Sequence, residues 1–158
     1  MLIELLTEPN YAANIIINLA SLPDFLRKPI LKKRMAEFFS LSEQEKEELI
    51  NNALDAGPTI PFPNFSKLFK TWLQVLSTFN EEQRKELFSK YINALINFPE
   101  KIIKFNLDGI LEIFMTLNEN EKFILSKSLS EIISELDVKK KKTVLILIPD
   151  NAKVQIGV

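Results

Sequence analysis

The chain has 158 residues, a formal net charge of −1, 46% hydrophobic residues and 26% charged residues. Because it contains neither Cys nor His, it lacks the thiolates and imidazoles of ordinary zinc sites and of Ser-His-Asp or Cys-His catalytic systems. The nearly balanced charge also argues against a protein that binds polyanions over its whole surface.

The N-terminal residues carry no sign of a signal peptide. The segment 1–6 is apolar, but it has no basic region and Glu4 interrupts it. The apolar run 15–20 is far shorter than the roughly 20 residues that a membrane span requires. We therefore expect a soluble, cytoplasmic protein with no membrane span, in which residues 1–7 add one helical turn.

A spacing of 38 residues recurs along the chain. It separates successive prolines, each preceded by an apolar residue, namely Pro23, Pro61 and Pro99. It also separates three polar segments of similar sequence, which begin at Leu41, Phe79 and Leu117. Since unrelated signals share one offset, the sequence predicts three helical-hairpin repeats.

Apolar periodicity and end signals predict seven helices in chain order. They span about residues 10–21, 28–40, 43–56, 64–78, 81–97, 100–116 and 119–136. The first is expected to cap the first core layer as half a repeat. Pro29 is then near the start of the second helix, where proline is tolerated. Gly57 ends the third helix, and the proline-rich linker 58–63 should be extended.

Each second helix of a repeat has a defined start. Ser42, Asn80 and Asn118 are predicted N-caps, and a Glu or Gln follows three residues later, which is the capping-box pattern. Core positions follow in the same register: Met35, Leu73 and Leu111; Phe38, Leu76 and Phe114; Leu49, Leu87 and Leu125. Aromatic residues at helical spacing, Phe65, Phe69 and Trp72, are also expected in the core, whereas Phe62 packs across a groove or meets a partner.

The pattern changes after Leu136. Four lysines, 139–142, precede the β-branched run 143–148, turn residues 149–152 and an alternating segment 153–158. This indicates a β-hairpin, or one strand and a tail. We therefore divide the chain into a helical-repeat domain, 1–138, and a basic hinge with a β segment, 139–158. The β segment packs on the helices, pairs with another chain, or becomes ordered only in a complex.

No motif predicts catalysis. The three glycines form no phosphate-binding loop, and the acidic clusters lie at helix starts, where acidic residues are expected on a solvated face. We predict no catalytic, cofactor-binding or metal-binding residue.

Basic residues concentrate on the first helix of each repeat, which makes them a candidate interaction surface. They are Arg27, Lys28, Lys32, Lys33, Arg34, Lys67, Lys70, Lys101 and Lys104, to which the apolar C-terminal residues Val144, Ile146 and Ile148 are added. Such a stripe attracts nucleic acid, anionic lipid or an acidic protein. An ordinary solvated helix face is the alternative interpretation.

The paired helices and their caps resemble HEAT or armadillo-like repeats, and the segment that begins at Leu117 is similar to the armadillo-like N-terminal domains of magnesium transporters. The resemblance covers about residues 10–136 and implies a mainly α fold. We expect a right-handed stack of about seven helices in three repeats of about 38 residues, followed by a short C-terminal β-hairpin or strand.

Repeat arrays mostly present surfaces to macromolecules. The leading hypothesis is a non-enzymatic protein-interaction module or scaffold whose partner is another protein, or a second copy of the chain bound through residues 143–158. A nucleic-acid-associated protein is the second, and a small-ligand-binding protein or enzyme the third.

Overall fold

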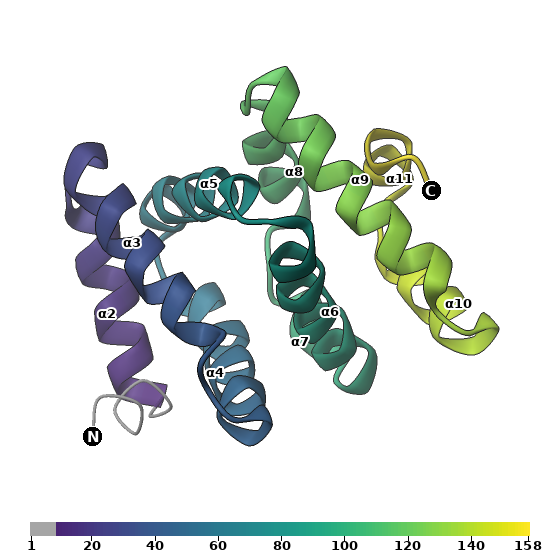
Figure 1. The fold of residues 1–158 in the computed structure, drawn as a ribbon, viewed down its shortest axis with the longest axis horizontal. Coiled ribbons are helices and arrows are strands. Elements are labelled where there is room, and N and C mark those ends of the chain that lie inside the picture. The colour runs from purple at the N-terminus through teal and green to yellow at the C-terminus, as the bar shows by residue number, and fades with distance from the viewer. Residues whose placement is uncertain (1–8) are drawn as a thin grey trace. The chain divides into compact units, whose positions relative to one another are not determined.

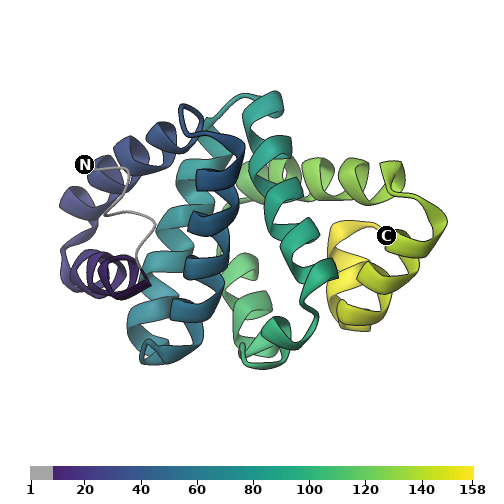
Figure 2. The ribbon, with the colours of Figure 1, turned by 90° about the horizontal axis from the view of Figure 1, so that it is seen from below.

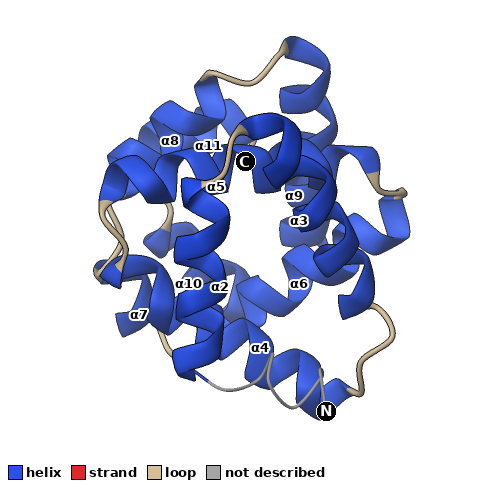
Figure 3. Cartoon of the chain, turned by 90° about the vertical axis from the view of Figure 1, so that its left-hand side faces the viewer, coloured by secondary structure: helices blue, strands red, loops and turns tan. Residues whose placement is uncertain are grey.

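A computed structural model describes residues 9–158, and every regular element in that part of the chain is a helix (Figures 1 and 3). The expected turn at residues 1–7 lies outside the described residues. A mainly α fold is therefore correct, but the described residues form ten α-helices and a short 3-10 helix rather than seven helices and a β-hairpin. The chain divides into two compact units, one ending at Val75 and the other beginning at Leu76.

The first unit contains four α-helices, the last of which crosses the unit boundary. They are α2 (Pro9–Ser21), α3 (Asp24–Phe38), α4 (Glu43–Ala56) and α5 (Phe62–Thr78), with a 3-10 turn, η1 (Gly57–Thr59), before α5. Helix α2 packs against α3 and α4. Two predicted starts were too late, because α3 begins at Asp24 and includes Pro29, and α5 begins two residues before the predicted 64. The linker after Gly57 is mostly helical, not extended.

The second unit continues through six helices. They are α6 (Glu81–Asn97), α7 (Glu100–Ile103), α8 (Leu107–Met115), α9 (Glu119–Glu135), α10 (Val138–Leu147) and α11 (Asp150–Ile156). The predicted helix 100–116 is broken in two. Asn106 interrupts it because its side chain accepts a hydrogen bond from the backbone amide of Gly109 at 3.0 Å and so starts α8 as a new N-cap.

The three predicted capping boxes are confirmed. The side chains of Ser42, Asn80 and Asn118 accept bonds from the amides three residues later at 3.2, 2.8 and 2.8 Å. In each box the Glu or Gln side chain bonds back to the N-cap amide. These caps fix the starts of α4, α6 and α9 at the predicted residues.

The predicted core is largely buried. Six of the nine register positions are less than 9% exposed: Met35, Leu73, Phe38, Leu76, Leu87 and Leu125. The other three, Leu49, Leu111 and Phe114, are half-buried. The expected aromatic core on α5 is half-buried at Phe65, Phe69 and Trp72, whose rings stack in series at 5.4 and 5.7 Å, and Phe62 at the helix start is exposed.

The β-hairpin prediction was wrong. Residues 138–147 and 150–156 form α10 and α11, and Figures 1 and 2 show α11 beside α9. The Asp137 side chain caps α10 by accepting a bond from the Lys140 amide at 2.8 Å, and Val144 is buried in the unit. Packing and a cap thus outweigh the modest helix penalty of β-branched residues. Most of residues 139–158 are therefore helical, and the expected β segment is absent from them.

Candidate interaction surface

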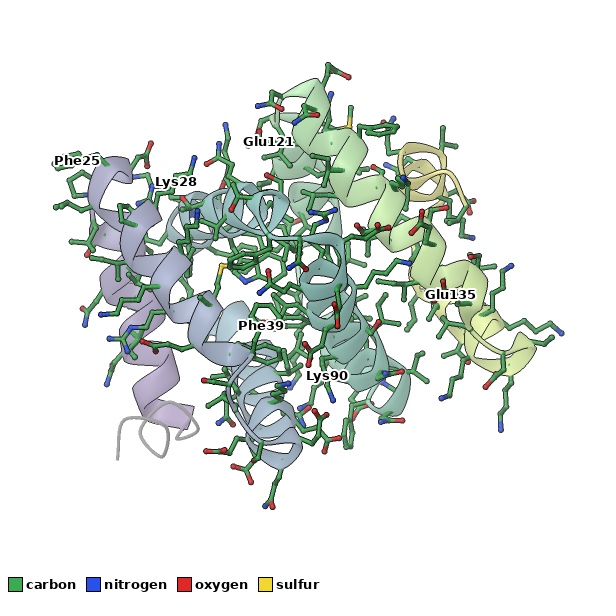
Figure 4. The ribbon with its side chains drawn as sticks, in the orientation of Figure 1. Phe25, Lys28, Phe39, Lys90, Glu121 and Glu135 are labelled. Carbon is green, nitrogen blue, oxygen red and sulfur yellow. The ribbon has the colours of Figure 1, made fainter. Side chains whose placement is uncertain are left out.

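Helix α3 exposes large apolar side chains next to lysines. Phe25 is 75% exposed, Leu26 42% and Ile30 40%, and Lys28 and Lys33 are exposed on the same helix. Figure 4 labels Phe25 and Lys28. We call Phe25, Leu26, Ile30 and Lys33 the α3 surface. Because soluble proteins expose few apolar side chains together unless they serve binding, this surface is a candidate docking site.

Helical geometry explains why these side chains point outward. The buried residues of α3 are Arg27, Leu31, Met35 and Phe38, which lie on one face at helical spacing. At steps of 100° per residue, Leu26 and Lys33 fall on the opposite side, and Ile30 lies at the edge of that side. Sequence reasoning missed Phe25 and Leu26 because the helix was expected to begin at Lys28. Pro23 with Asp24 in the first turn was the available signal for the earlier start.

Arg27 has a structural role instead of a place on the predicted basic surface. Its side chain is 2% exposed. It donates to the Thr71 hydroxyl at 3.0 Å and to the carbonyls of Leu22 at 2.5 Å and Ala20 at 3.4 Å, and it pairs with the Asp24 carboxylate. Arg27 therefore joins the end of α2, the start of α3 and the middle of α5.

The other predicted basic residues have mixed surroundings. Lys32, Lys67 and Lys104 are exposed, and Lys70 is half-buried. Arg34 lies 4.0 Å from the Glu37 carboxylate, and the Lys101 ammonium lies 5.1 Å from the centre of the Phe98 ring. These residues are divided between the two units, so a single continuous basic stripe stays a prediction.

The predicted C-terminal residues do not share one surface. Val144 is buried and Ile148 is half-buried, whereas Ile146 is 82% exposed. Val138 is 78% exposed, and it lies on the outward side of α10 with Ile146 two turns away. All four lysines, 139–142, are exposed on this helix. With no strand in α10 or α11, pairing of two copies through a strand edge in residues 143–158 loses its basis.

An ionic cluster joins α6 to α9. The Lys85 ammonium lies 2.9 Å from a Glu131 carboxylate oxygen, 3.6 Å from Glu135 and 4.0 Å from Glu81. The hydrogen bond to Glu131 is the main reason that the pKa of Lys85 is raised above 10.5, and the same bond lowers the pKa of Glu131 below 4.5. Both shifts favour the charged forms, so neither residue is tuned as a general acid or base near neutral pH.

A small pocket lies beside this cluster, with a volume of about 130 Å³. Its lining comes from α6 and the end of α9: Ser89, Ile92, Asn93, Ile132, Glu135 and Leu136. Pockets for cofactors and drug-sized ligands are larger, at roughly 300–1,000 Å³. On the neighbouring part of α6, burial raises the pKa of Tyr91 to about 12, which keeps its hydroxyl neutral at physiological pH. This pocket therefore offers little support for the enzyme hypothesis.

Within residues 9–158, no three carboxylates come together in an arrangement that would hold a metal ion. No described helix combines the length and apolar character needed to cross a membrane. Comparison of the chain with protein-family models, curated proteins and solved structures gave no match. The α3 surface is thus the strongest candidate site in the described part of the chain.

Proposed function

We propose that this protein is a non-enzymatic, helical-repeat interaction module that binds another protein. The observation that carries the proposal is the exposure of Phe25, Leu26 and Ile30 on one helix that also exposes lysines. Burying such side chains against a partner would release their apolar surface from water, at roughly 25 cal/mol per Å². Aromatic and aliphatic anchors of this kind carry most of the affinity at protein interfaces.

The positions of the helix starts support a repeat architecture in this proposal. Helices α3, α5, α7 and α10 begin at residues 24, 62, 100 and 138, and α4, α6 and α9 begin at 43, 81 and 119. Both series have a spacing of 38 residues, so the hairpin unit recurs as it does in HEAT or armadillo-like arrays. Arrays of this type bury a continuous core between neighbouring units and leave extended helix faces for partners.

A protein partner explains the α3 surface better than nucleic acid does. Phosphate contacts require only cations, and they leave exposed Leu26 and Ile30 without a role. A partner protein uses both features, because its apolar side chains cover the leucine and isoleucine while its carboxylates meet the lysines. Nucleic acid is therefore the competing outcome of the test.

The test is a selection of binding peptides from a displayed library of helical peptides. The wild-type chain is the target, and the Leu26→Asp/Ile30→Asp variant is the counter-selection target. The control is Val138→Asp/Ile146→Asp, which makes the same kind of change at two apolar residues of α10 that are 78% and 82% exposed. Circular dichroism verifies that both variants keep their helical content.

We expect the selected peptides to bind the wild-type chain and the α10 variant but not the α3 variant. Peptides that bind all three chains equally, or a library that yields no binder, would refute the proposed use of the α3 surface. Salt-sensitive binding of single-stranded RNA, lost in Lys28→Glu and kept in the α3 variant, would replace the proposal with the nucleic-acid function.

A further inference from the structure

The same hydrogen bond joins helices of neighbouring repeats in both units. In the first unit the Arg27 Nε of α3 donates to Thr71 Oγ1 of α5 at 3.0 Å. In the second unit the Arg84 Nε of α6 donates to Ser128 Oγ of α9 at 3.1 Å. Both bonds join residues 44 apart, and both accepting residues are at most 4% exposed.

These two bonds define how one helix packs on its counterpart in the next repeat. Equivalent residues of successive repeats are 38 apart, whereas the bonded residues are 44 apart. Each arginine therefore contacts the position six residues beyond its own counterpart in the next repeat. Each arginine also donates to the carbonyl five residues before it, from Arg27 to Leu22 and from Arg84 to Phe79. The bond recurs in two separate units, once between the first helices and once between the second helices of successive repeats.

The same 44-residue relation identifies the position on α3 that a preceding helix would contact in the way that α3 contacts α5. Thr71 is the position of α5 that receives Arg27, and its counterpart in α3, 38 residues earlier, is Lys33. Thr71 is 4% exposed, whereas Lys33 is exposed. Leu26 and Ile30, which are 42% and 40% exposed, lie on one side of Lys33 around the helix axis. Within the α3 surface, Lys33 is therefore equivalent to the α5 residue that α3 contacts, and Leu26 and Ile30 lie beside it.

We propose that the α3 surface receives an acidic amphipathic helix from a partner protein, which packs on α3 as α3 packs on α5. This inference rests on the proposed function and names the partner. Where α3 offers the Arg27 guanidinium to Thr71, the partner helix offers a carboxylate to the Lys33 ammonium. A cation at that position would be repelled by Lys33 and by the exposed Lys28 and Lys32 of the same helix.

The position of Lys33 favours a protein helix over an anionic membrane. Helices that lie on membranes keep their lysines on the polar side and bury a continuous apolar face. Lys33 lies between Leu26 and the exposed Pro29 around the helix axis, within the apolar face. Inserting this face into a bilayer would carry the ammonium into the acyl region, whereas a partner helix can supply one carboxylate there.

The probes for the test are two synthetic peptides that copy residues 23–39, the α3 helix with its flanking residues. In both peptides glutamine replaces the three lysines of the segment, and the same lactam staple on the outward face holds the helix. One peptide carries Arg27→Glu and the other keeps Arg27. Circular dichroism confirms that both are helical before fluorescence anisotropy measures their binding to the full-length chain.

We expect the glutamate peptide to bind the wild-type chain about tenfold more tightly than the arginine peptide, as close charge pairs at interfaces do. The Lys33→Glu variant should reverse this preference. Lys104→Glu, which changes an exposed lysine outside the α3 surface, should leave it unchanged.

Three results would overturn the inference. The first is failure of both helical peptides to bind, the second is equal binding of the two peptides, and the third is a Lys33→Glu variant with the wild-type preference. Sedimentation of the wild-type chain with phosphatidylserine-containing vesicles, without peptide binding, would assign the surface to lipid. The proposed function would survive the first three results if the library selection still yields peptides that require Leu26 and Ile30, because that selection makes no assumption about charge.

Discussion

Replacing Arg27 with alanine removes the side chain that joins α2, α3 and α5 in the first unit. The lost hydrogen bonds to Thr71 at 3.0 Å and to the Leu22 carbonyl at 2.5 Å involve a charged donor, and each contributes about 1.5–3 kcal/mol. The pair with Asp24 adds little, because that carboxylate is 92% exposed. We therefore expect the free energy of unfolding to fall by about 3–5 kcal/mol.

Thr71→Val tests the same interaction from the other side. It leaves one buried N–H of Arg27 without its acceptor and should cost about 1–3 kcal/mol. Since the two residues contact each other, their effects should not add, and the Arg27→Ala/Thr71→Val double variant should show a coupling of about 1–2 kcal/mol. Urea unfolding followed by the fluorescence of Trp72, the single tryptophan, reports on this unit, with circular dichroism in parallel.

Lys28→Ala is the control for this series. Lys28 follows Arg27 in α3 but is exposed, so its removal should change the stability by less than about 0.5 kcal/mol. Additive effects of the Arg27 and Thr71 substitutions would show that the hydrogen bond does not couple the two helices. A loss at Arg27 no larger than that at Lys28 would refute the entire structural role assigned to the guanidinium.

Three further predictions concern the second unit. The folded pKa of Lys85 is raised above 10.5 and that of Glu131 is lowered below 4.5, so their pair should stabilise the fold between pH 4.5 and 10.5. This stabilisation should be lost as pH rises through the folded pKa of Lys85 or falls through that of Glu131. Glu131→Gln should therefore flatten the pH profile of urea unfolding. Burial raises the folded pKa of Tyr91 from 10.0 to about 12, so stability should decline as pH rises between them, and a tyrosinate absorbance titration should lose its late step in Tyr91→Phe. Val144→Ala should cost about 1–3 kcal/mol in urea unfolding, whereas Ile146→Ala at an 82% exposed position should cost less than about 0.5; equal effects would contradict the orientation of α10.

The N-caps were predictable because they are local. Ser42, Asn80 and Asn118 satisfy backbone amides three residues away, and that chemistry depends little on the rest of the fold. The C-terminal helices were not predicted, although Asp137 offers a local N-cap signal of the same kind. The β-branched run 143–148 favours a strand locally, and the β-hairpin prediction followed it. The 38-residue spacing from Glu100 and the cap at Asp137 were signals for a helix start at Val138 that this prediction did not use. The longer-range signal was correct because tertiary packing outweighs local propensity.

The candidate site was predictable only in part. Lys28, Lys32 and Lys33 were assigned to the exposed side of a helix, and they lie there. Their apolar neighbours were missed because Pro29 was taken as a helix start. Proline within a helix removes one backbone hydrogen bond, and Pro29 lies in the second turn of α3, where its own position is exposed. Arg27 could not be separated from the other basic residues, since its burial depends on Thr71, 44 residues later.

The two arginines occupy a position that is unfavourable by local rules. Arg27 and Arg84 are the fourth residues of α3 and α6, near the positive ends of those helix dipoles. Each compensates by donating to carbonyls at the end of the preceding helix, where the dipole is negative, and to a hydroxyl in the next repeat. Only guanidinium has enough donors in a fixed planar arrangement to serve all these acceptors at once. In α4 and α9 the fourth residue is a lysine, and it pairs with the glutamate three residues before it, Glu43 or Glu119. An arginine at the fourth position, followed 44 residues later by Ser or Thr, is therefore a sequence signal for contact between repeats, which neither helix periodicity nor net charge would have revealed.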